Sequence, residues 1–387
     1  MTTRTAAARQ HLERLLRVAT CLAQCGYGAQ VGQLAATARA FRGDAQLWTA
    51  QARNRGPAGR TLLMHAAYTG NVPRIQFLLE RGADVEATSV LGSTALMVAC
   101  RQKRIHYEPL VVRMLVELGG ANVNATRSSD GHTALIYASL NGHVEMVCFL
   151  VEHGATAVTS ATDDGFTALM GASQNGHLEI VRFLVERGGA NVNAARTTDG
   201  MTALVWASQN GHLEIARFLV ERGSAFVNAG RSTDGMTALI SASQHGHLEI
   251  VRFLVERGGD VSALMNDNTN ALMKACFYSH PEIVRFLVDS GKAAVNATYG
   301  GKTALMWACF DGFTEIVRIL VGRGGANVNS ASPIDGMTAL LLACHKGHHE
   351  VVCLLLQLGA DNRALSGSGE TAHDLAAGFP LVLAALS

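Results

Sequence analysis

The sequence predicts an all-α repeat solenoid, because one short pattern recurs along most of its 387 residues. A Thr-Ala-Leu phrase or a close variant returns at intervals of 33 to 39 residues. A Gly-His pair follows by nine residues in half of the copies, and an Asn-Val-Asn phrase occurs three times. Together these phrases predict a curved stack of helix-turn-helix repeats with β-hairpin-like fingers, preceded by a small N-terminal helical segment.

The recurring phrase marks ten repeats. Its first residue is threonine in nine copies and asparagine in one: Thr61, Thr94, Thr133, Thr167, Thr202, Thr237, Asn270, Thr303, Thr338 and Thr371. A period of about 33 residues suits one turn and two short helices. We therefore expect a repeat domain over residues 57–387 and a separate helical segment over residues 1–56.

Each repeat is expected to open with a turn and a capped helix. In the fifth repeat Asp199-Gly200 supplies the turn, because glycine tolerates a positive φ and aspartate accepts hydrogen bonds from the following backbone. Thr202 then caps the first helix, which stops near Asn210-Gly211. Ala203 and Ala207 are small enough to let neighbouring helices approach closely.

A second helix is expected after His212, and Gly223 ends it. One face of this helix is apolar, and charged residues such as Glu214 and Arg217 can face water. A single repeat cannot bury that face, so the repeats must stack on one another. The apolar positions are Leu213, Ile215, Ala216, Leu219 and Val220.

The chain resembles the ankyrin-repeat family over about residues 57–387. The resemblance rests on Asp-Gly-Met-Thr-Ala-Leu at 234–239, Gly-His-Leu-Glu-Ile-Val at 246–251 and the extended arm Asn-Val-Asn-Ala at 191–194. The family's Thr-Pro-Leu-His has become Thr-Ala-Leu followed by an apolar residue. We expect apolar packing to replace the hydrogen bonds attributed to that histidine, through Met97, Met170, Met273 and Met306.

Two repeats depart from the pattern. The Thr94 repeat is six residues longer than a 33-residue spacing, and the excess lies around residues 101–109, between its two helices. This insertion is either a tolerated loop or a recognition feature, and its basic residues would suit an acidic partner: Arg101, Lys103, Arg104 and His106. The last repeat, around residues 370–376, resembles a C-terminal capping repeat.

Composition argues against several kinds of partner. Lys and Arg number 32 against 31 for Asp and Glu, so no net field would draw the chain to nucleic acid or to an anionic membrane. No apolar run approaches the roughly 18 residues that a membrane span requires. We expect no nucleic-acid partner and no membrane insertion.

The titratable residues follow the repeat rather than a catalytic or metal-binding pattern. The histidines of the Gly-His pairs are interpreted as repeat positions: His143, His177, His212, His247 and His348. Cys100, Cys276, Cys309 and Cys344 share a register with serines, which indicates a small packed side chain. No nucleophile stands beside a base and no phosphate-binding loop follows a strand. The sequence predicts no catalytic residue, metal or cofactor.

Positions that vary between repeats are the candidates for recognition. The resemblance implies that the fourth and seventh residues after the threonine register face a concave groove, where aromatic residues make good anchors. The alternative is local packing between repeats, but Gly171 and Ser241 at the same register argue against a general need for aromatic residues. The predicted groove residues are Tyr68, Tyr137, Trp206, Lys274, Phe277, Trp307, Phe310 and His345, and the predicted finger residues are Arg196, Arg231 and Tyr299.

Residues 1–56 have two interpretations. One is a resemblance to the later part of an F-box, a helical module that docks onto the Skp-type adaptor of cullin ubiquitin ligases, although the usual Leu-Pro opening is missing. The residues that carry it are Leu15-Leu16, Leu22, Val31, Leu34–Phe41 and Leu47-Trp48. The other interpretation is a helical cap on the first repeat. Arginines in residues 1–17 also fit a mitochondrial presequence, but we expect a cytoplasmic protein, with the nucleus as an alternative.

These observations predict a protein-interaction scaffold that binds one or more proteins through the groove and fingers. The alternative function is a substrate-recruiting, F-box-like subunit of a cullin-type ubiquitin ligase. An enzyme is not expected.

Overall fold

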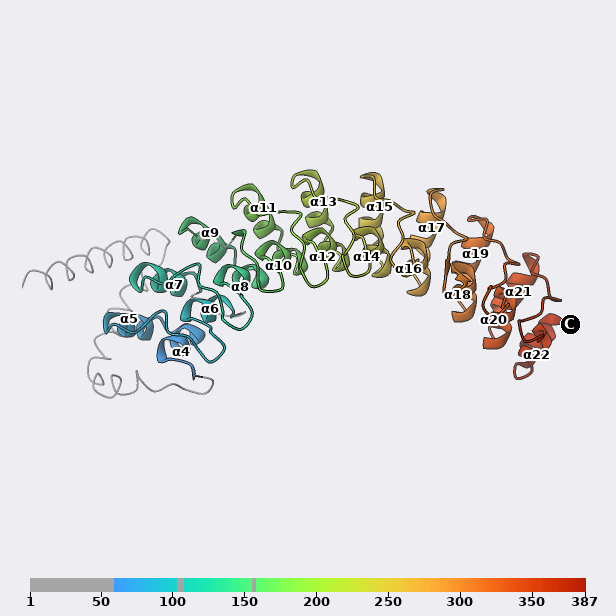
Figure 1. Ribbon diagram of the computed structural model, residues 1–387, viewed down its shortest axis with the longest axis horizontal. Coiled ribbons are helices and arrows are strands. Elements are labelled where there is room, and N and C mark those ends of the chain that lie inside the picture. Colours follow the sequence, from blue (N-terminus) through green and yellow to red (C-terminus); the bar gives the residue numbers. More distant parts are fainter. Residues whose placement is uncertain (1–58, 103–107, 155–157) are drawn as a thin grey trace, which may run out of the picture. The chain divides into compact units, whose positions relative to one another are not determined.

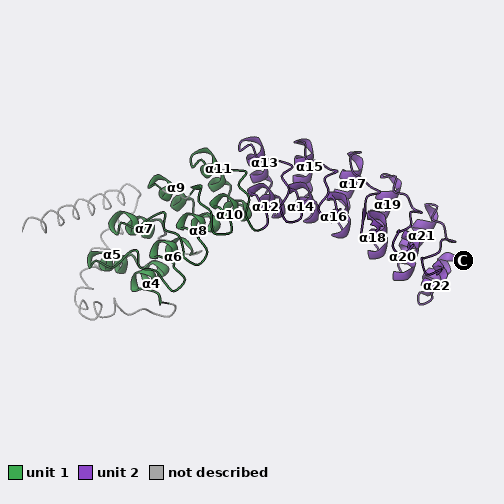
Figure 2. Ribbon diagram, in the orientation of Figure 1, with its two compact units in different colours: residues 1–198 green, residues 199–387 purple. Residues whose placement is uncertain are grey.

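The computed structural model describes residues 59–102, 108–154 and 158–387. Within these residues the helices form ten consecutive pairs, one for each predicted repeat (Figure 1). The chain divides into two compact units, residues 1–198 and residues 199–387 (Figure 2). The predicted segment over residues 1–56 lies outside the described residues.

Unit 1 contains the first four helix pairs. In each pair the second helix packs on the first, and first helices contact first helices of the adjacent repeats. The pairs are α4 (Leu62–Thr69) with α5 (Val72–Glu80), α6 (Ala95–Cys100) with α7 (Glu108–Arg113), α8 (Ala134–Asn141) with α9 (Val144–Glu152), and α10 (Ala168–Gln174) with α11 (Leu178–Glu186).

Unit 2 contains the other six pairs, in which first helices form one row and second helices another (Figure 1). The first helices are α12 (Ala203–Gln209), α14 (Ala238–Gln244), α16 (Ala271–Phe277), α18 (Ala304–Asp311), α20 (Ala339–Lys346) and α22 (Ala372–Leu375). The second helices are α13 (Leu213–Glu221), α15 (Leu248–Glu256), α17 (Pro281–Asp289), α19 (Thr314–Gly322), α21 (His349–Gln357) and α23 (Pro380–Leu386).

The recurring threonine, or asparagine in one repeat, caps the first helix of every repeat. Thr202 Oγ1 accepts a hydrogen bond from the Val205 amide at 3.3 Å, and Asn270 does the same through Oδ1 for Met273 at 2.9 Å. This bond satisfies one of the amides that a helix start leaves unpaired. Before the cap, Asp199 Oδ1 accepts a hydrogen bond from the Met201 amide at 3.1 Å. This is the backbone hydrogen bond that was predicted for the Asp-Gly turn.

Three of the five residues predicted for the apolar face of the second helix are buried, and Phe218 is buried in addition. In α13 the buried residues are Ile215, Ala216, Phe218 and Leu219, whereas Leu213 and Val220 are only half-buried. At the position where the family has histidine, the predicted methionines are all buried at 1% exposure or less. The prediction that apolar packing fills that position is confirmed.

A different histidine register links adjacent repeats. In unit 2, Nε2–H of His247 donates to the Gln209 carbonyl at 3.0 Å and that of His280 to the Gln244 carbonyl at 3.0 Å. The His280 ring also lies directly against Gly246, where a Cβ would be 2.7 Å from Cε1. We call this bond the inter-repeat histidine bond. It occurs in unit 1 as well, from His177 to the Leu140 carbonyl at 3.2 Å.

Two interfaces in unit 2 have no such bond, because phenylalanine stands at the histidine position before α19 and before α23. Phe313 precedes α19 at the position where His280 precedes α17, and its side chain has no nitrogen to donate. One repeat earlier, Ser279 stands in the glycine position with φ of 55°, a left-handed conformation that is unfavourable for residues other than glycine. The α16 to α18 interface therefore differs from its neighbours.

The fingers are short hairpins, and in the described part of the chain three of them close with a single bridge, such as Ala331 with Thr338. One finger forms a regular strand pair, β1 (Thr298–Tyr299) with β2 (Lys302–Thr303). Its turn residues Gly300 and Gly301 both have positive φ, 56° and 76°, as a type I′ hairpin requires.

The insertion in the second repeat falls between α6 and α7, as predicted, and it also lengthens the second helix. α7 continues into a π-helical turn, η3 (Met114–Leu118), a form that accommodates extra residues within a helix. Arg101 is exposed beside the insertion, whereas the predicted basic residues Lys103, Arg104 and His106 lie outside the described residues.

Buried serines on the first helices should reduce stability. Among the described residues, the buried hydroxyls of Ser173 and Ser243 find no hydrogen-bond partner, at positions that Cys309 occupies in another repeat. We expect Ser173→Ala and Ser243→Ala each to raise the free energy of unfolding by about 1 kcal/mol, measured by urea denaturation. Cys309→Ser should lower it, and a stabilising Cys309→Ser would contradict this account.

Candidate functional site

Four half-buried aromatic side chains of unit 2 form a continuous group. Phe277 ends α16, Trp307 and Phe310 lie on α18, and Tyr299 belongs to the finger between these helices. The Trp307 ring centroid lies 5.3 Å from that of Phe277, 6.0 Å from that of Phe310 and 6.2 Å from that of Tyr299. All four were predicted as binding residues. We call them the aromatic cluster.

Trp307 is the central residue of the aromatic cluster, because its ring contacts the other three rings. Residues 307 and 310 are three apart on one helix and therefore share a face, and Phe277 occupies the register of Phe310 one repeat earlier. The Trp307 indole Nε1 is shielded from solvent and finds no hydrogen-bond acceptor among the described residues. An unpaired buried donor costs stability, so packing alone does not explain a tryptophan here.

Lys302 connects the cluster to the next finger. It lies directly opposite Tyr299 in the hairpin, which places both side chains on one face. Its Nζ is 5.9 Å from the Trp307 ring centroid and 2.9 Å from Asp335 Oδ2. Hydrogen bonds from Ser332 and Lys302, against the opposing effect of burial, lower the pKa of Asp335 to about 2.

This pKa predicts a stability loss in acid. A carboxylate whose folded pKa lies below its unfolded value of 3.8 stabilises the fold above that value, and the contribution disappears as pH falls from about 4 to about 2. We therefore expect Asp335→Asn to be less stable than wild type at pH 6, and the difference to shrink toward pH 2. Urea unfolding at each pH measures it, and a constant difference would contradict the prediction.

Two more lysines border the aromatic cluster. Lys346, at the end of α20, places Nζ 4.2 Å from the Phe310 ring centroid, within cation–π range. Lys274 is half-buried on α16, one helical turn before Phe277. Lys274 was predicted from its register, whereas Lys346 was not.

The other groove residues predicted in unit 2 lie outside the aromatic cluster. Trp206 is half-buried on α12, which is separated from α18 by the intervening first helices α14 and α16. His345 is exposed on α20 beside Lys346. Trp206 is therefore a separate aromatic position, and His345 lies next to the rim of the cluster.

Unit 1 holds the remaining two predicted groove residues. Tyr68 is 43% exposed, with the Arg60 guanidinium 5.5 Å from its ring centroid. Tyr137 is only 7% exposed and stacks on His132 at 5.0 Å, so it offers a partner little area. Gly171 stands at the same register as Tyr137. The Leu140 side chain occupies the space beside it, because a Cβ on Gly171 would lie 2.9 Å from Leu140 Cγ. The residue size tolerated at this register therefore depends on local neighbours.

The two predicted finger arginines form ion pairs within the chain. Arg231 pairs with Asp234 in its own finger, with Nε 3.0 Å from Oδ1, and this hydrogen bond lowers the pKa of Asp234 despite burial. Arg196 instead reaches Asp164 of the preceding finger, with Nε 2.8 Å from Oδ2. Both guanidinium groups thus have a structural role in positioning the fingers.

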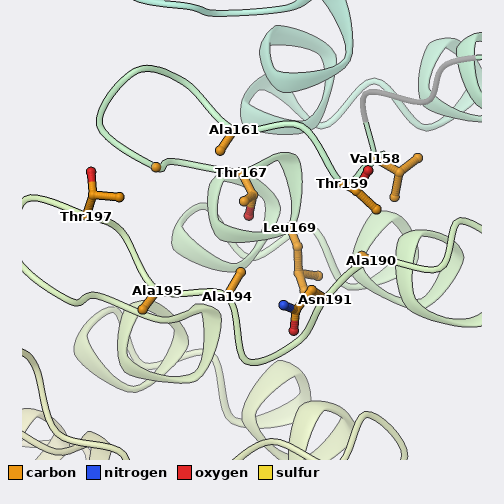
Figure 3. A pocket seen from close by; sticks show the side chains of 11 residues that line it. Val158, Thr159, Ala161, Thr167, Leu169, Ala190, Asn191, Ala194, Ala195 and Thr197 are labelled. Carbon is orange, nitrogen blue, oxygen red and sulfur yellow. The ribbon is translucent and has the colours of Figure 1, made fainter.

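A cavity of about 210 Å³ lies in unit 1 between two successive finger arms. Figure 3 shows side chains of both arms around it, including Val158 and Thr159 on one arm and Ala194 and Thr197 on the other, with Leu169 between them. No acid, base or thiol lines this cavity. Its lining is made of apolar residues together with Thr and Asn.

The thiols of the described first helices are buried, whereas the half-buried Cys353 places Sγ 3.5 Å from His349 Nε2 on α21. Burial raises the pKa of Cys344 to about 12 and also raises the pKa of Cys276 and Cys309, so their reactive thiolate forms are scarce at neutral pH. Among the described residues, no three His, Cys, Asp or Glu side chains gather as metal ligands would. No helix in this part of the chain has both the length and the apolar composition to cross a membrane.

Comparison with a model of ankyrin repeats (three copies) gives matches over residues 29–127, 106–196, 189–265, 257–332 and 297–366. The matched residues cover most of the chain. The first match begins at residue 29, within the segment that the sequence assigned to a separate N-terminal part.

Curated relatives are similar over part of the repeat array. A putative E3 ubiquitin-protein ligase XBAT34 from Arabidopsis thaliana is 38% identical over 95 residues, 24% of each chain. The ankyrin repeat and SAM domain-containing protein 6 of Danio rerio is 33% identical over 178 residues, 38% of this chain and 23% of that protein. Protein fem-1 homolog A-like of Mus musculus is 32% identical over 94 residues, 24% of this chain and 13% of that protein. The chain thus spans a quarter or less of the length of each of these relatives.

Proposed function

Because this chain belongs to the ankyrin-repeat family, we propose that it is an interaction scaffold whose first helices and fingers bind a protein partner. The aromatic cluster carries the proposal. Its four rings stand half-buried on the face shared by two first helices and a finger, which in this family corresponds to the predicted concave groove. Aromatic side chains bury large areas with few rotatable bonds, so they are efficient binding anchors.

The proposed role is binding without catalysis. The cluster offers rings, ammonium groups and one carboxylate that is already paired with Lys302, a set suited to recognition. We propose a cytoplasmic location for this activity, because the buried Cys276, Cys309 and Cys344 are free thiols, which suits a reducing compartment.

An affinity pull-down with quantitative mass spectrometry tests the proposal. The full chain should enrich a protein that Trp307→Ala loses, while Trp206→Ala, a change of the same chemistry outside the cluster, should retain most of it. A partner captured equally by all three proteins would place the binding surface elsewhere. If no protein is enriched over an unrelated repeat protein, the scaffold function fails.

A second candidate function is recruitment of substrates to a cullin-type ubiquitin ligase through residues 1–56. It is favoured by the F-box-like residues noted above and by relatives that carry E3 ubiquitin ligase names, although those match only about a quarter of this chain. Deletion of residues 1–56 should then abolish co-purification of a Skp-type adaptor while the array keeps its helical circular dichroism and its other partner. Absence of the adaptor from the full-chain capture would reject this function.

A further inference from the structure

The first helices around the aromatic cluster carry more positive than negative charge. α16 contributes Lys274, and α20 contributes Lys346 together with the neighbouring His345. Neither helix contains a carboxylate, and α18 contains one, Asp311 at its end. In contrast, each of the second helices α17, α19 and α21 carries an exposed glutamate in its first turn. Because these glutamates at least offset Arg285 on α17 and Arg318 on α19, the net positive charge lies on the first helices that bear the cluster.

Lys274 and Lys346 are available for an incoming negative charge. In the described part of the chain neither lies within ion-pair distance of a carboxylate, whereas Lys302 is already paired with Asp335. Lys274 is near enough to help lower the pKa of Asp234, but that carboxylate is hydrogen-bonded chiefly to Arg231. Lys346 rests on the Phe310 ring, which holds its charge at the edge of the cluster.

We propose that the partner segment bound by the aromatic cluster is acidic. This inference rests on the proposed scaffold function and specifies the partner's chemistry. An apolar or aromatic side chain of the partner packs against Trp307 and Phe310, and carboxylates on either side pair with Lys274 and Lys346. Complementary charge at the edge of an apolar contact gives specificity and a faster association rate.

The positions of Lys274 and Lys346 also predict the approximate distance between the two carboxylates of the partner segment. Lys274 and Lys346 lie on α16 and α20, with α18 and the cluster between them. Neighbouring helices pack about 10 Å apart, so the two lysines are on the order of 20 Å apart. An extended peptide covers roughly 3.3 Å per residue, so about six residues span this distance. The expected motif has carboxylates near both ends and an apolar residue in the middle.

Selection from a phage library of random 12-residue peptides, with the full chain as bait, tests this chemistry. Wild type should enrich peptides with Asp or Glu flanking an apolar or aromatic residue. The double variant Lys274→Glu/Lys346→Glu should bind the enriched peptide at least about tenfold more weakly at low salt. Lys292→Glu/Arg318→Glu, which changes the net charge equally but away from the first helices, should bind it as wild type does.

The outcomes separate the two proposals. Enrichment of basic or uncharged peptides by wild type, lost in Trp307→Ala, would overturn the acidic motif and leave the scaffold function standing. Peptides retained equally by Trp307→Ala would remove the cluster as the binding surface and contradict both. A fluorescein-labelled 12-nucleotide oligothymidine that bound more tightly than the enriched peptide would show that the basic and aromatic groups recognise a nucleic acid instead.

Discussion

Gly246→Ala is expected to lower the free energy of unfolding by about 2 to 3 kcal/mol. Gly246 has φ of 80°, a left-handed conformation that costs roughly 1 to 2 kcal/mol for an L-residue with a Cβ. The new Cβ would also lie 2.7 Å from Cε1 of His280, so the ring must move. Its displacement breaks the inter-repeat histidine bond to Gln244, worth about another 1 kcal/mol. Urea denaturation followed by circular dichroism gives the value.

Gly258→Ala is the matched control for this change. Gly258 has nearly the same φ, 84°, but a Cβ there would meet nothing within 4 Å. It should therefore show the backbone cost alone. Equal losses in the two variants would mean that the histidine contact contributes nothing. In a double-mutant cycle, His280→Ala should remove most of the extra cost of Gly246→Ala.

Trp307→Ala is expected to weaken partner binding by about 2 kcal/mol or more, roughly 30-fold, with a smaller loss of fold stability. The indole is the central ring of the aromatic cluster, yet its half-buried position and unpaired Nε1 make it a modest contributor to the fold. Isothermal titration with the protein captured by the full chain measures the first quantity, and urea unfolding the second.

Two control variants show whether the effect of Trp307→Ala comes from lost partner contacts or from lost packing. Trp307→Phe removes the unpaired N–H and keeps a ring, so it should leave stability almost unchanged and weaken binding less than alanine does. Trp206→Ala removes the same side chain from the same register of another repeat, outside the cluster. A larger stability loss than binding loss in Trp307→Ala would identify the residue as inter-repeat packing.

The sequence predicted the repeat fold well because the local signals repeat. Each threonine cap, each Asp-Gly turn and each buried methionine depends on contacts within one repeat or with its neighbour, so ten copies of the pattern reinforce one prediction. What the pattern could not reveal is which histidine register links the repeats. The bonds from His247 and His280 depend on a glycine one repeat earlier, a relation between residues more than 30 positions apart.

The candidate site was only partly predictable for the same reason. Phe277, Trp307 and Phe310 stood out by register, but their contact with Tyr299 depends on the two-glycine turn of the hairpin. Lys302 and Lys346 were missed, although Gly300-Gly301 in place of the usual Asp-Gly was a visible signal of a different finger. Tyr137 shows the opposite error: its register suggested exposure, and its neighbours bury it.

The exception at Phe313 has a consequence for how the array opens. Without an inter-repeat histidine bond, and with Ser279 in a left-handed conformation, the α16 to α18 interface should be weaker than the α12 to α14, α14 to α16 and α18 to α20 interfaces, which have that bond. Repeat arrays lose structure at weak interfaces first, since each repeat is stabilised chiefly by its neighbours. Amides of α18 should therefore exchange with deuterium before those of α14. A partner seated on the aromatic cluster would bridge this interface and slow that exchange.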